Sequence, residues 1–138
     1  MSDINTKDNF FSFKGRIRRS TFGIRLIAFY IGVFISYFLI SIGTILAIEI
    51  FATILPESTP GVGVFILLIL LFILYLIVFI AYIMQIVKRL HDLDKEEIWA
   101  ILIFVPLVSV IFLLYLIFTD GTVGPNRYGE DPKGRTPY

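Results

Sequence analysis

The feature that most constrains this chain is an uncharged apolar segment, Val62–Val87, which ends abruptly in the charged run Lys88–Asp92. A helix needs about 20 apolar residues to cross the hydrocarbon core of a bilayer, and this segment is longer. Hydrophobic residues form 57% of the 138-residue chain, whereas an ordinary soluble domain holds about 45–50%. The sequence therefore predicts an all-α integral membrane protein, with a single membrane domain over residues 1–138 and short loops.

Two long hydrophobic helices are expected first in the chain, over about 22–55 and about 62–87. Ser20 is the expected cap of the first helix, because its hydroxyl can accept a hydrogen bond from a free backbone N–H of the first turn. At about 1.5 Å per residue, that helix would be about 51 Å long, which exceeds the hydrocarbon core. It would therefore tilt, kink near Gly43 or project beyond the membrane.

A third hydrophobic helix is expected over about 95–118, with Asp94 as its N-cap and Glu97 at the third helical position. Pro106, near its middle, leaves two alternatives. A kinked full span would place the following tail outside the cell. A re-entrant hairpin that turns at Pro106–Ser109 would return the tail to the cytoplasm. The sequence favours the kinked span, because irregular backbone at mid-depth needs protein cover that two other helices scarcely provide.

The placement of Lys and Arg predicts the orientation of the chain. Six of these residues lie within Lys7–Arg25 and three in the expected loop 88–97, whereas the connection that holds the Pro56–Gly61 turn has none. Cytoplasmic segments carry an excess of Lys and Arg. The juxtamembrane arm of residues 1–20 and the loop 88–97 are therefore expected in the cytoplasm, and the turn outside.

Three motifs together resemble a known family. In chain order they are Gly15-Arg16-Ile17-Arg18-Arg19 with Phe22, Arg89-Leu90-His91-Asp92, and Gly121-Thr122-Val123-Gly124-Pro125-Asn126-Arg127-Tyr128-Gly129-Glu130-Asp131-Pro132. Over roughly Phe10–Pro132 the chain is similar to the YhaH-like bacterial inner-membrane family, domain of unknown function 805. The resemblance implies a small multi-pass protein of the bacterial cytoplasmic (inner) membrane and supplies no activity or site residues. The chain departs from the family pattern at Gly23, Glu96–Trp99 and Ser109.

Eight polar residues of these motifs are the candidate contacts for partners or for anionic lipid headgroups. They are Arg16, Arg18, Arg19, Arg89, His91, Asp92, Asn126 and Arg127. In the alternative interpretation, His91 and Asp92 form local hydrogen bonds and pair with Arg89 or an N-terminal arginine. A pH-sensing role for His91 competes with that interpretation.

The tail, residues 119–138, is rich in Gly and Pro and is expected to form successive turns. Its backbone N–H groups could hold an anion together with Arg127. The alternative is a self-satisfied cap, because Asn and Asp side chains bond to turn backbones. A pairing of Asp120 or Asp131 with an arginine, namely Arg16, Arg18 or Arg89, requires the tail to lie inside the cell.

No metal, cofactor or catalytic site is expected. The chain has one histidine and no cysteine, which is too few ligands for a zinc site in one chain. No motif marks a nucleophile held beside a base. The few cations lie beside a membrane segment, where lipid rather than nucleic acid is the nearest polyanion.

Polar side chains recur at helical spacing within the first two expected helices. They are Tyr30, Tyr37, Ser41 and Thr44 on one, and Tyr75, Tyr82, Gln85 and Arg89 on the other. Polar groups in lipid favour interhelical partners, so these faces are expected to meet within one chain or across a homo-oligomer. They could also line a polar pathway for a solute.

The sequence thus favours a non-enzymatic scaffold or interaction protein that contacts a membrane-protein partner or anionic headgroups at the cytoplasmic face. A small oligomeric transporter or channel is the alternative. An intramembrane enzyme is the weakest of the three hypotheses.

Overall fold

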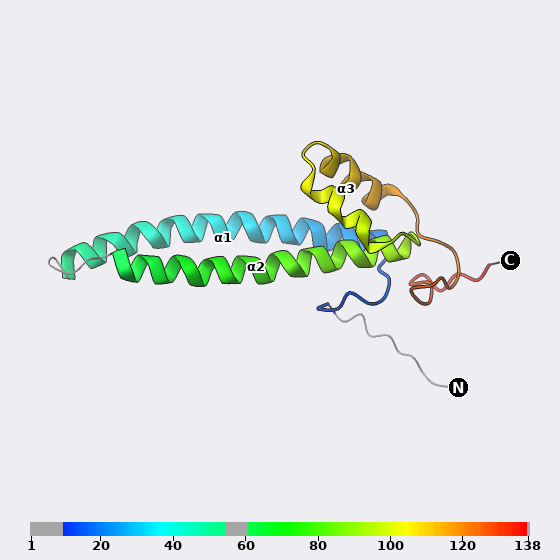
Figure 1. Ribbon diagram of the computed structural model, residues 1–138, viewed down its shortest axis with the longest axis horizontal. Helices are drawn as coiled ribbons and strands as arrows, with labels where there is room; N and C mark the ends of the chain where they lie inside the picture. The colour runs from blue at the N-terminus through cyan, green and yellow to red at the C-terminus, as the bar shows by residue number, and fades with distance from the viewer. Residues whose placement is uncertain (1–9, 55–60, 138) are drawn as a thin grey trace, which may run out of the picture. The chain divides into compact units, whose positions relative to one another are not determined.

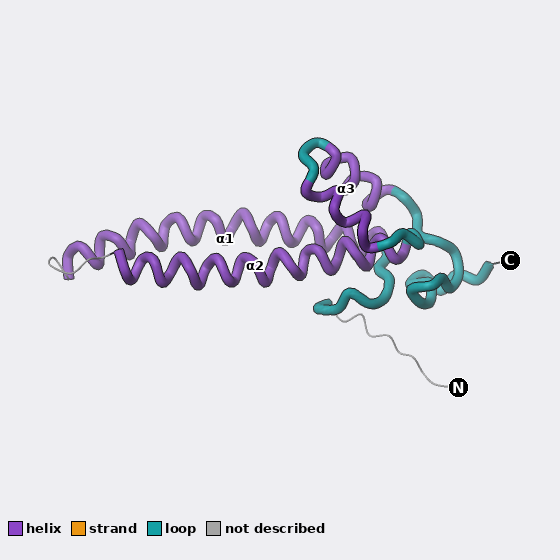
Figure 2. Tube along the Cα trace, viewed as in Figure 1, coloured by secondary structure: helices purple, strands orange, loops and turns teal. Residues whose placement is uncertain are grey.

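The computed structural model describes residues 10–54 and 61–137, and within these ranges it is helical with no strand (Figures 1 and 2). Four helices follow in order: α1 (Arg19–Ile54), α2 (Gly61–Asp92), the 3₁₀ helix η1 (Glu97–Phe104) and α3 (Val108–Phe118). The expected all-α class is confirmed, whereas the expected count of three hydrophobic helices differs from the four observed.

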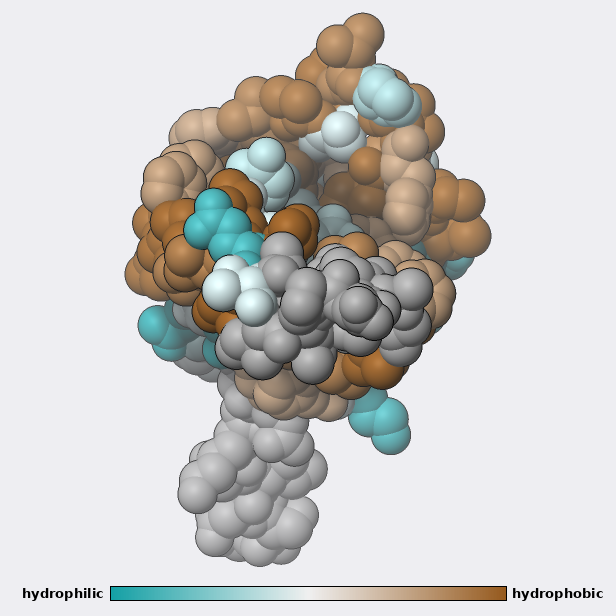
Figure 3. Space-filling view, turned by 90° about the vertical axis from the view of Figure 1, so that its left-hand side faces the viewer, coloured by the Kyte–Doolittle hydropathy of each residue, from teal (hydrophilic) through white to brown (hydrophobic). Residues whose placement is uncertain are grey.

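Helices α1 and α2 are both long and apolar enough to cross a membrane, over Arg19–Ile50 and Phe65–Asp92. The protein buries 0% of the apolar window of the first segment and 6% of that of the second. A core helix of a soluble protein would be mostly buried. Their apolar side chains therefore need cover from outside the chain, and apolar residues dominate the end-on surface in Figure 3.

The chain divides into two compact units. The first holds Met1–Ile27 and Ile80–Tyr138, and the second holds Ala28–Phe79. All 12 Lys and Arg residues of the sequence fall within the ranges of the first unit. The second unit is a pair of apolar helical segments, in which Ser41 donates a hydrogen bond to Tyr37 O (2.8 Å) and Thr44 to Ser41 O (3.0 Å). These two hydroxyls thus bond to their own helix rather than across to another.

Helix α1 begins earlier than predicted. The backbone N–H of Phe22 donates to the carbonyl oxygen of Arg18 at 2.9 Å, so Arg18 occupies the position before the first helical residue, Arg19. Ser20 consequently lies inside the first turn and is not the cap. Gly43, a predicted site for a kink, lies within an α1 that continues to Ile54.

Helix α2 continues through the charged run that was predicted to be a loop, and it ends at Asp92. Asp94, the predicted N-cap of the next helix, instead closes the end of α2. It adopts a positive φ of 55°, its N–H donates to His91 O (3.1 Å), and the N–H of Lys95 donates to Leu90 O (2.9 Å). This pair of bonds is the Schellman motif, which satisfies the last carbonyl groups of a helix.

The predicted third helix is replaced by two, because Val105–Leu107 is not helical. Pro106 has no N–H to donate, and Leu107 has a φ of 66°. The chain reverses here, and η1 and α3 pack side by side (Figures 1 and 2). This geometry is that of a hairpin, whereas the sequence favoured a kinked span over a hairpin. We call Glu97–Phe118 the hairpin.

Candidate functional site

The polar centre of the first unit is built around the guanidinium group of Arg16. Its Nε donates to Asp92 Oδ1 (3.2 Å), and its Nη1 donates to the carbonyl oxygens of Gly124 (2.8 Å) and Gly129 (3.1 Å). Its Nη2 donates to both oxygens of Thr122, the carbonyl at 2.8 Å and the hydroxyl at 3.0 Å. All three nitrogens therefore join the N-terminal arm to α2 and to the tail.

Arg89, within α2, likewise joins segments of the chain through its guanidinium donors, and it is 0% exposed. Its Nε donates to Leu116 O (2.8 Å) near the end of α3, and its Nη2 donates to Thr119 O. Its Nη1 contacts Asp92 Oδ2 and also donates to Ile17 O (3.4 Å). Arg16, Arg89 and Asp92 form what we call the Arg-Asp cluster, which ties four segments of the chain together.

Burial makes this cluster energetically demanding. Arg16 is 8% exposed and Asp92 is 3% exposed, and the transfer of an ion out of water costs several kcal/mol. One carboxylate between two guanidinium groups leaves a net positive charge. The surrounding carbonyl oxygens compensate by directing the negative ends of their dipoles at the arginine nitrogens.

The tail reaches the cluster through Gly121 and Thr122. The N–H of Thr122 donates to Asp92 O at 2.9 Å, and Asn126 Nδ2 donates to His91 O at 2.8 Å. A side chain at Gly121 would collide with the carboxylate of Asp92. Only glycine permits this close approach of the backbone.

His91 is enclosed by the same tail. Its ring stacks on Tyr128 with centroids 3.8 Å apart and planes within 6°. Its Nδ1 lies 3.3 Å from Gly15 O, so this nitrogen carries the hydrogen, because a carbonyl oxygen can only accept. Its Nε2 lies 3.9 Å from Glu97 Oε1. His91 thus packs between the arm, the tail and the start of the hairpin.

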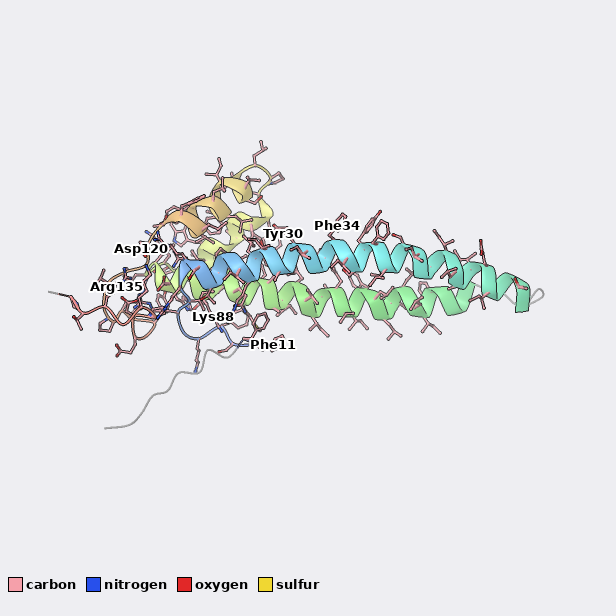
Figure 4. All side chains as sticks on the ribbon, turned by 180° about the vertical axis from the view of Figure 1, so that it is seen from behind. Phe11, Tyr30, Phe34, Lys88, Asp120 and Arg135 are labelled. Carbon is pink, nitrogen blue, oxygen red and sulfur yellow. The ribbon has the colours of Figure 1, made fainter. Side chains whose placement is uncertain are left out.

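A second charged group, around Asp131 and Asp120, stabilises the turns of the tail. Desolvation opposes the ionisation of Asp131, but hydrogen bonds from Arg135 and from the N–H groups of Lys133 and Gly124 outweigh it and lower the pKa of Asp131 to about 2. The pKa of Asp120 is also lowered, chiefly by its hydrogen bond from Lys133. Asp120 and Arg135 lie near each other in Figure 4.

The structure separates the eight candidate residues into two groups. Arg16, Arg89, His91, Asp92 and Asn126 come together in the buried centre. Arg18, Arg19 and Arg127 are exposed. Of these, Arg18 donates to Pro132 O, Arg19 donates to Phe118 O (3.5 Å), and Arg127 pairs with Asp94 (3.2 Å).

The alternative interpretation of His91 and Asp92 is therefore confirmed for Asp92, which pairs with Arg89 and Arg16. The tail also lies with the N-terminal motif, although the described contacts of Arg16 and Arg18 with the tail are to backbone oxygens and Thr122 rather than to Asp120 or Asp131. Sequence reasoning missed Thr122 and Tyr128. Both stood in the third motif, but nothing in their spacing indicated which residues they would contact.

Among the described residues, no group of three His, Asp or Glu side chains is placed to hold a metal ion. The Arg-Asp cluster has its hydrogen-bonding groups engaged by the chain itself. Chemically, this arrangement fixes the relative positions of four segments.

Comparison with known proteins identifies the family of this chain. The family described as protein of unknown function (DUF805) matches residues 10–130. The chain belongs to the DUF805 family. The resemblance seen in the three motifs is thereby confirmed, and every contact of the Arg-Asp cluster lies inside the matched range.

Two relatives of this DUF805 protein are the inner membrane proteins YhaI and YhaH of Escherichia coli K12. YhaI is 51% identical over 47 residues, which cover 34% of this chain and 40% of YhaI. YhaH is 39% identical over 46 residues, which cover 33% of this chain and 38% of YhaH. The chain thus matches well under half the length of these relatives. No solved structure matches it.

Proposed function

We propose that this DUF805 protein is a non-enzymatic scaffold of the bacterial inner membrane, which presents a rigid polar unit to partners and to anionic headgroups at the cytoplasmic face. The observation that carries the proposal is the Arg-Asp cluster. Its two arginines use their donors to join the arm, α2, the hairpin and the tail. Such a saturated centre suits a role in holding a surface in shape.

The membrane location rests on two independent observations. Helices α1 and α2 are long and apolar enough to span a bilayer, and both relatives carry the name inner membrane protein. The cytoplasmic placement rests on charge. All 12 Lys and Arg residues belong to the first unit, and such residues concentrate on the cytoplasmic side.

The contact with lipid is assigned to the exposed part of the arm. Phe11 is 72% exposed and is labelled in Figure 4, and the exposed cations Lys14, Arg18 and Arg19 follow it. Aromatic rings sit at the headgroup level, and each cation near an anionic surface contributes about 1 kcal/mol of attraction. The buried Arg16 and Arg89 are not part of this contact.

Purification in mild detergent tests the scaffold. The wild-type protein is expected to retain a stable partner. Arg127→Ala and Lys95→Ala change exposed residues, so a loss of the partner from either variant would locate the contact. Arg89→Ala would disturb the buried cluster and so would report on folding instead. Retention of no partner, together with solute flux above that of empty liposomes, would replace the scaffold with the transporter hypothesis.

Binding to detergent-solubilised anionic lipid tests the headgroup contact. The triple variant Lys14→Gln, Arg18→Gln and Arg19→Gln is expected to retain less phosphatidylglycerol than the wild type. The matched control is Glu130→Gln, which changes an exposed charge in the tail. Equal retention by all three proteins would remove the arm from this role.

A further inference from the structure

The hairpin presents a surface that water cannot cover favourably. Leu107 at its turn is 82% exposed, and Phe118 at its end is 73% exposed. Further exposed apolar side chains extend along both of its helices: Ile98, Ile101, Phe104, Val110, Ile111 and Leu114. Soluble surfaces rarely expose a contiguous apolar patch beyond a few hundred Å². Some apolar material therefore covers the hairpin.

Both ends of the hairpin are fixed at one place. Its start follows directly from the cap of α2, where Lys95 N–H donates to Leu90 O at 2.9 Å. Its end is held by Arg89, whose Nε donates to Leu116 O at 2.8 Å. Because α2 ends among charged residues, the hairpin starts and finishes at a polar boundary, and its turn lies away from both ends (Figure 1).

The backbone of the turn satisfies most of its own hydrogen-bonding groups. The N–H groups of Val105, Val108 and Ser109 donate to the carbonyl oxygens of Leu102, Pro106 and Val105, at 3.2, 2.8 and 2.9 Å, and Pro106 has no N–H. An unsatisfied backbone group costs several kcal/mol in hydrocarbon, and this turn leaves few. Leu107 is the central residue of the three-residue turn that Val108 closes on Pro106. Its positive φ of 66° is a strained backbone conformation for a leucine.

The two legs of the hairpin are matched in length. The eight residues of η1 span about 16 Å at 2.0 Å per residue. The 11 residues of α3 span about 16 Å at 1.5 Å per residue. The hydrocarbon core is about 30 Å thick, so each leg reaches about halfway. Trp99 lies near the base of the first leg, and tryptophan is enriched at the interface between membrane and water.

We propose that the hairpin enters the bilayer from the face at which the first unit lies, and that the acyl chains of that one leaflet cover it. The inference rests on the membrane location given under the proposed function. It is independent of the scaffold role and of which face is cytoplasmic. The partner of this surface is thus the hydrocarbon of a single leaflet, and the tail returns to the side from which the hairpin started.

Depth-dependent fluorescence quenching tests the insertion. Trp99 is the only tryptophan of the chain, so the wild type reports on the base of the hairpin. The variant Trp99→Phe with Leu107→Trp reports on its turn, and Trp99→Phe with Val105→Trp is a second reporter there. Each protein is placed in phosphatidylcholine–phosphatidylglycerol vesicles whose acyl chains carry bromine near the headgroup, in the middle or near the end.

The turn tryptophan is expected to be quenched most by deep bromines and to emit at shorter wavelength, whereas Trp99 is quenched most by shallow ones. Quenching of the turn by aqueous acrylamide rather than by bromolipid would overturn the proposal. The proposal would also be overturned if no bromolipid quenched the turn tryptophan and Leu107→Cys formed an intermolecular disulfide. A second copy of the chain would then cover the turn. Circular dichroism of each variant identifies any that fails to fold.

Surface labelling separates the hairpin from a full span. The chain has no cysteine, so Phe11→Cys and Val123→Cys each introduce a single exposed thiol, in the arm and in the tail. The hairpin requires both thiols to react with an impermeant maleimide from the same face. Reaction from opposite faces would overturn it. Reaction of both from the periplasm would support the hairpin and overturn the cytoplasmic placement of the proposed function.

Discussion

At the scale of single residues, the first unit depends on one carboxylate. Asp92 lies between Arg16 and Arg89, and the three side chains are almost fully buried. A buried ion pair adds little net stability compared with apolar residues, but the loss of one partner leaves a buried charge uncompensated. The cluster therefore acts mainly by fixing which segments of the chain meet.

Replacement of this carboxylate tests its role. Asp92→Asn keeps the shape of the side chain and removes its charge, which leaves two buried guanidinium groups without a counterion. We expect a loss of about 3–5 kcal/mol of stability, measured by thermal unfolding in detergent. Asp94→Asn, at an exposed ion pair with Arg127, is the control and should cost at most about 1 kcal/mol. Equal losses in both variants would argue against the cluster.

The approach of the tail to Asp92 gives a second prediction. Gly121→Ala places a methyl group against the carboxylate and should detach the tail, which limited proteolysis after residue 119 would detect. Gly23→Ala is the matched control, because nothing lies within 4 Å of the added carbon and alanine is preferred over glycine inside a helix by about 0.5–1 kcal/mol. Equal resistance of wild type and Gly121→Ala would contradict the close approach.

At the scale of elements, the charged residues decide where helices end. The run that follows the apolar part of α2 remains helical, because Asp92 finds a partner in the arm and Arg89 finds partners in the hairpin and the tail. The helix ends only where Asp94 adopts a left-handed conformation. The tail is then an element of its own, without regular structure, which side-chain hydrogen bonds to Asp131 and Asp120 hold together.

This arrangement makes the tail sensitive to acid. The pKa of Asp131 in the folded tail is about 2, below its ordinary value of 3.8. The ionised carboxylate thus favours the folded tail fully above pH 3.8, and this contribution is lost as the pH falls through about 2. The protection of the Gly124 and Lys133 amides from hydrogen exchange, measured by mass spectrometry relative to the unstructured chain at the same pH, should fall over this range. Asp131→Asn should remove the pH dependence; its persistence would assign it to another group.

At the scale of the whole molecule, positive charge is divided sharply along the chain. The first unit holds every Lys and Arg, and the second holds none. A chain with this division has a clear preference for one orientation in a membrane. Arg16 of the arm donates to Gly124 O and Thr122 O of the tail, so these two described segments share whichever side the first unit occupies.

The orientation is testable with the same cysteine-free background. In inverted inner-membrane vesicles, Phe11→Cys should react with an impermeant maleimide, and Ser58→Cys, in the predicted outer turn, should react only in intact spheroplasts. The expected pattern follows from the distribution of Lys and Arg. The reverse pattern would show that the first unit lies outside.

The sequence by itself determined the helical class, the two long apolar helices and the family, because long uncharged segments and local motifs are properties of neighbouring residues. It also singled out Arg16, Arg89 and Asp92, yet it could not show that they meet. The contacts of Arg16 with tail residues 106 to 113 positions away depend on how the chain reverses at Pro106, and local preferences allowed both a kinked span and a hairpin. The tertiary structure decided that reversal, the continuation of α2 and the use of Asp94 as a C-terminal cap, because each depends on partners that only the folded chain brings near.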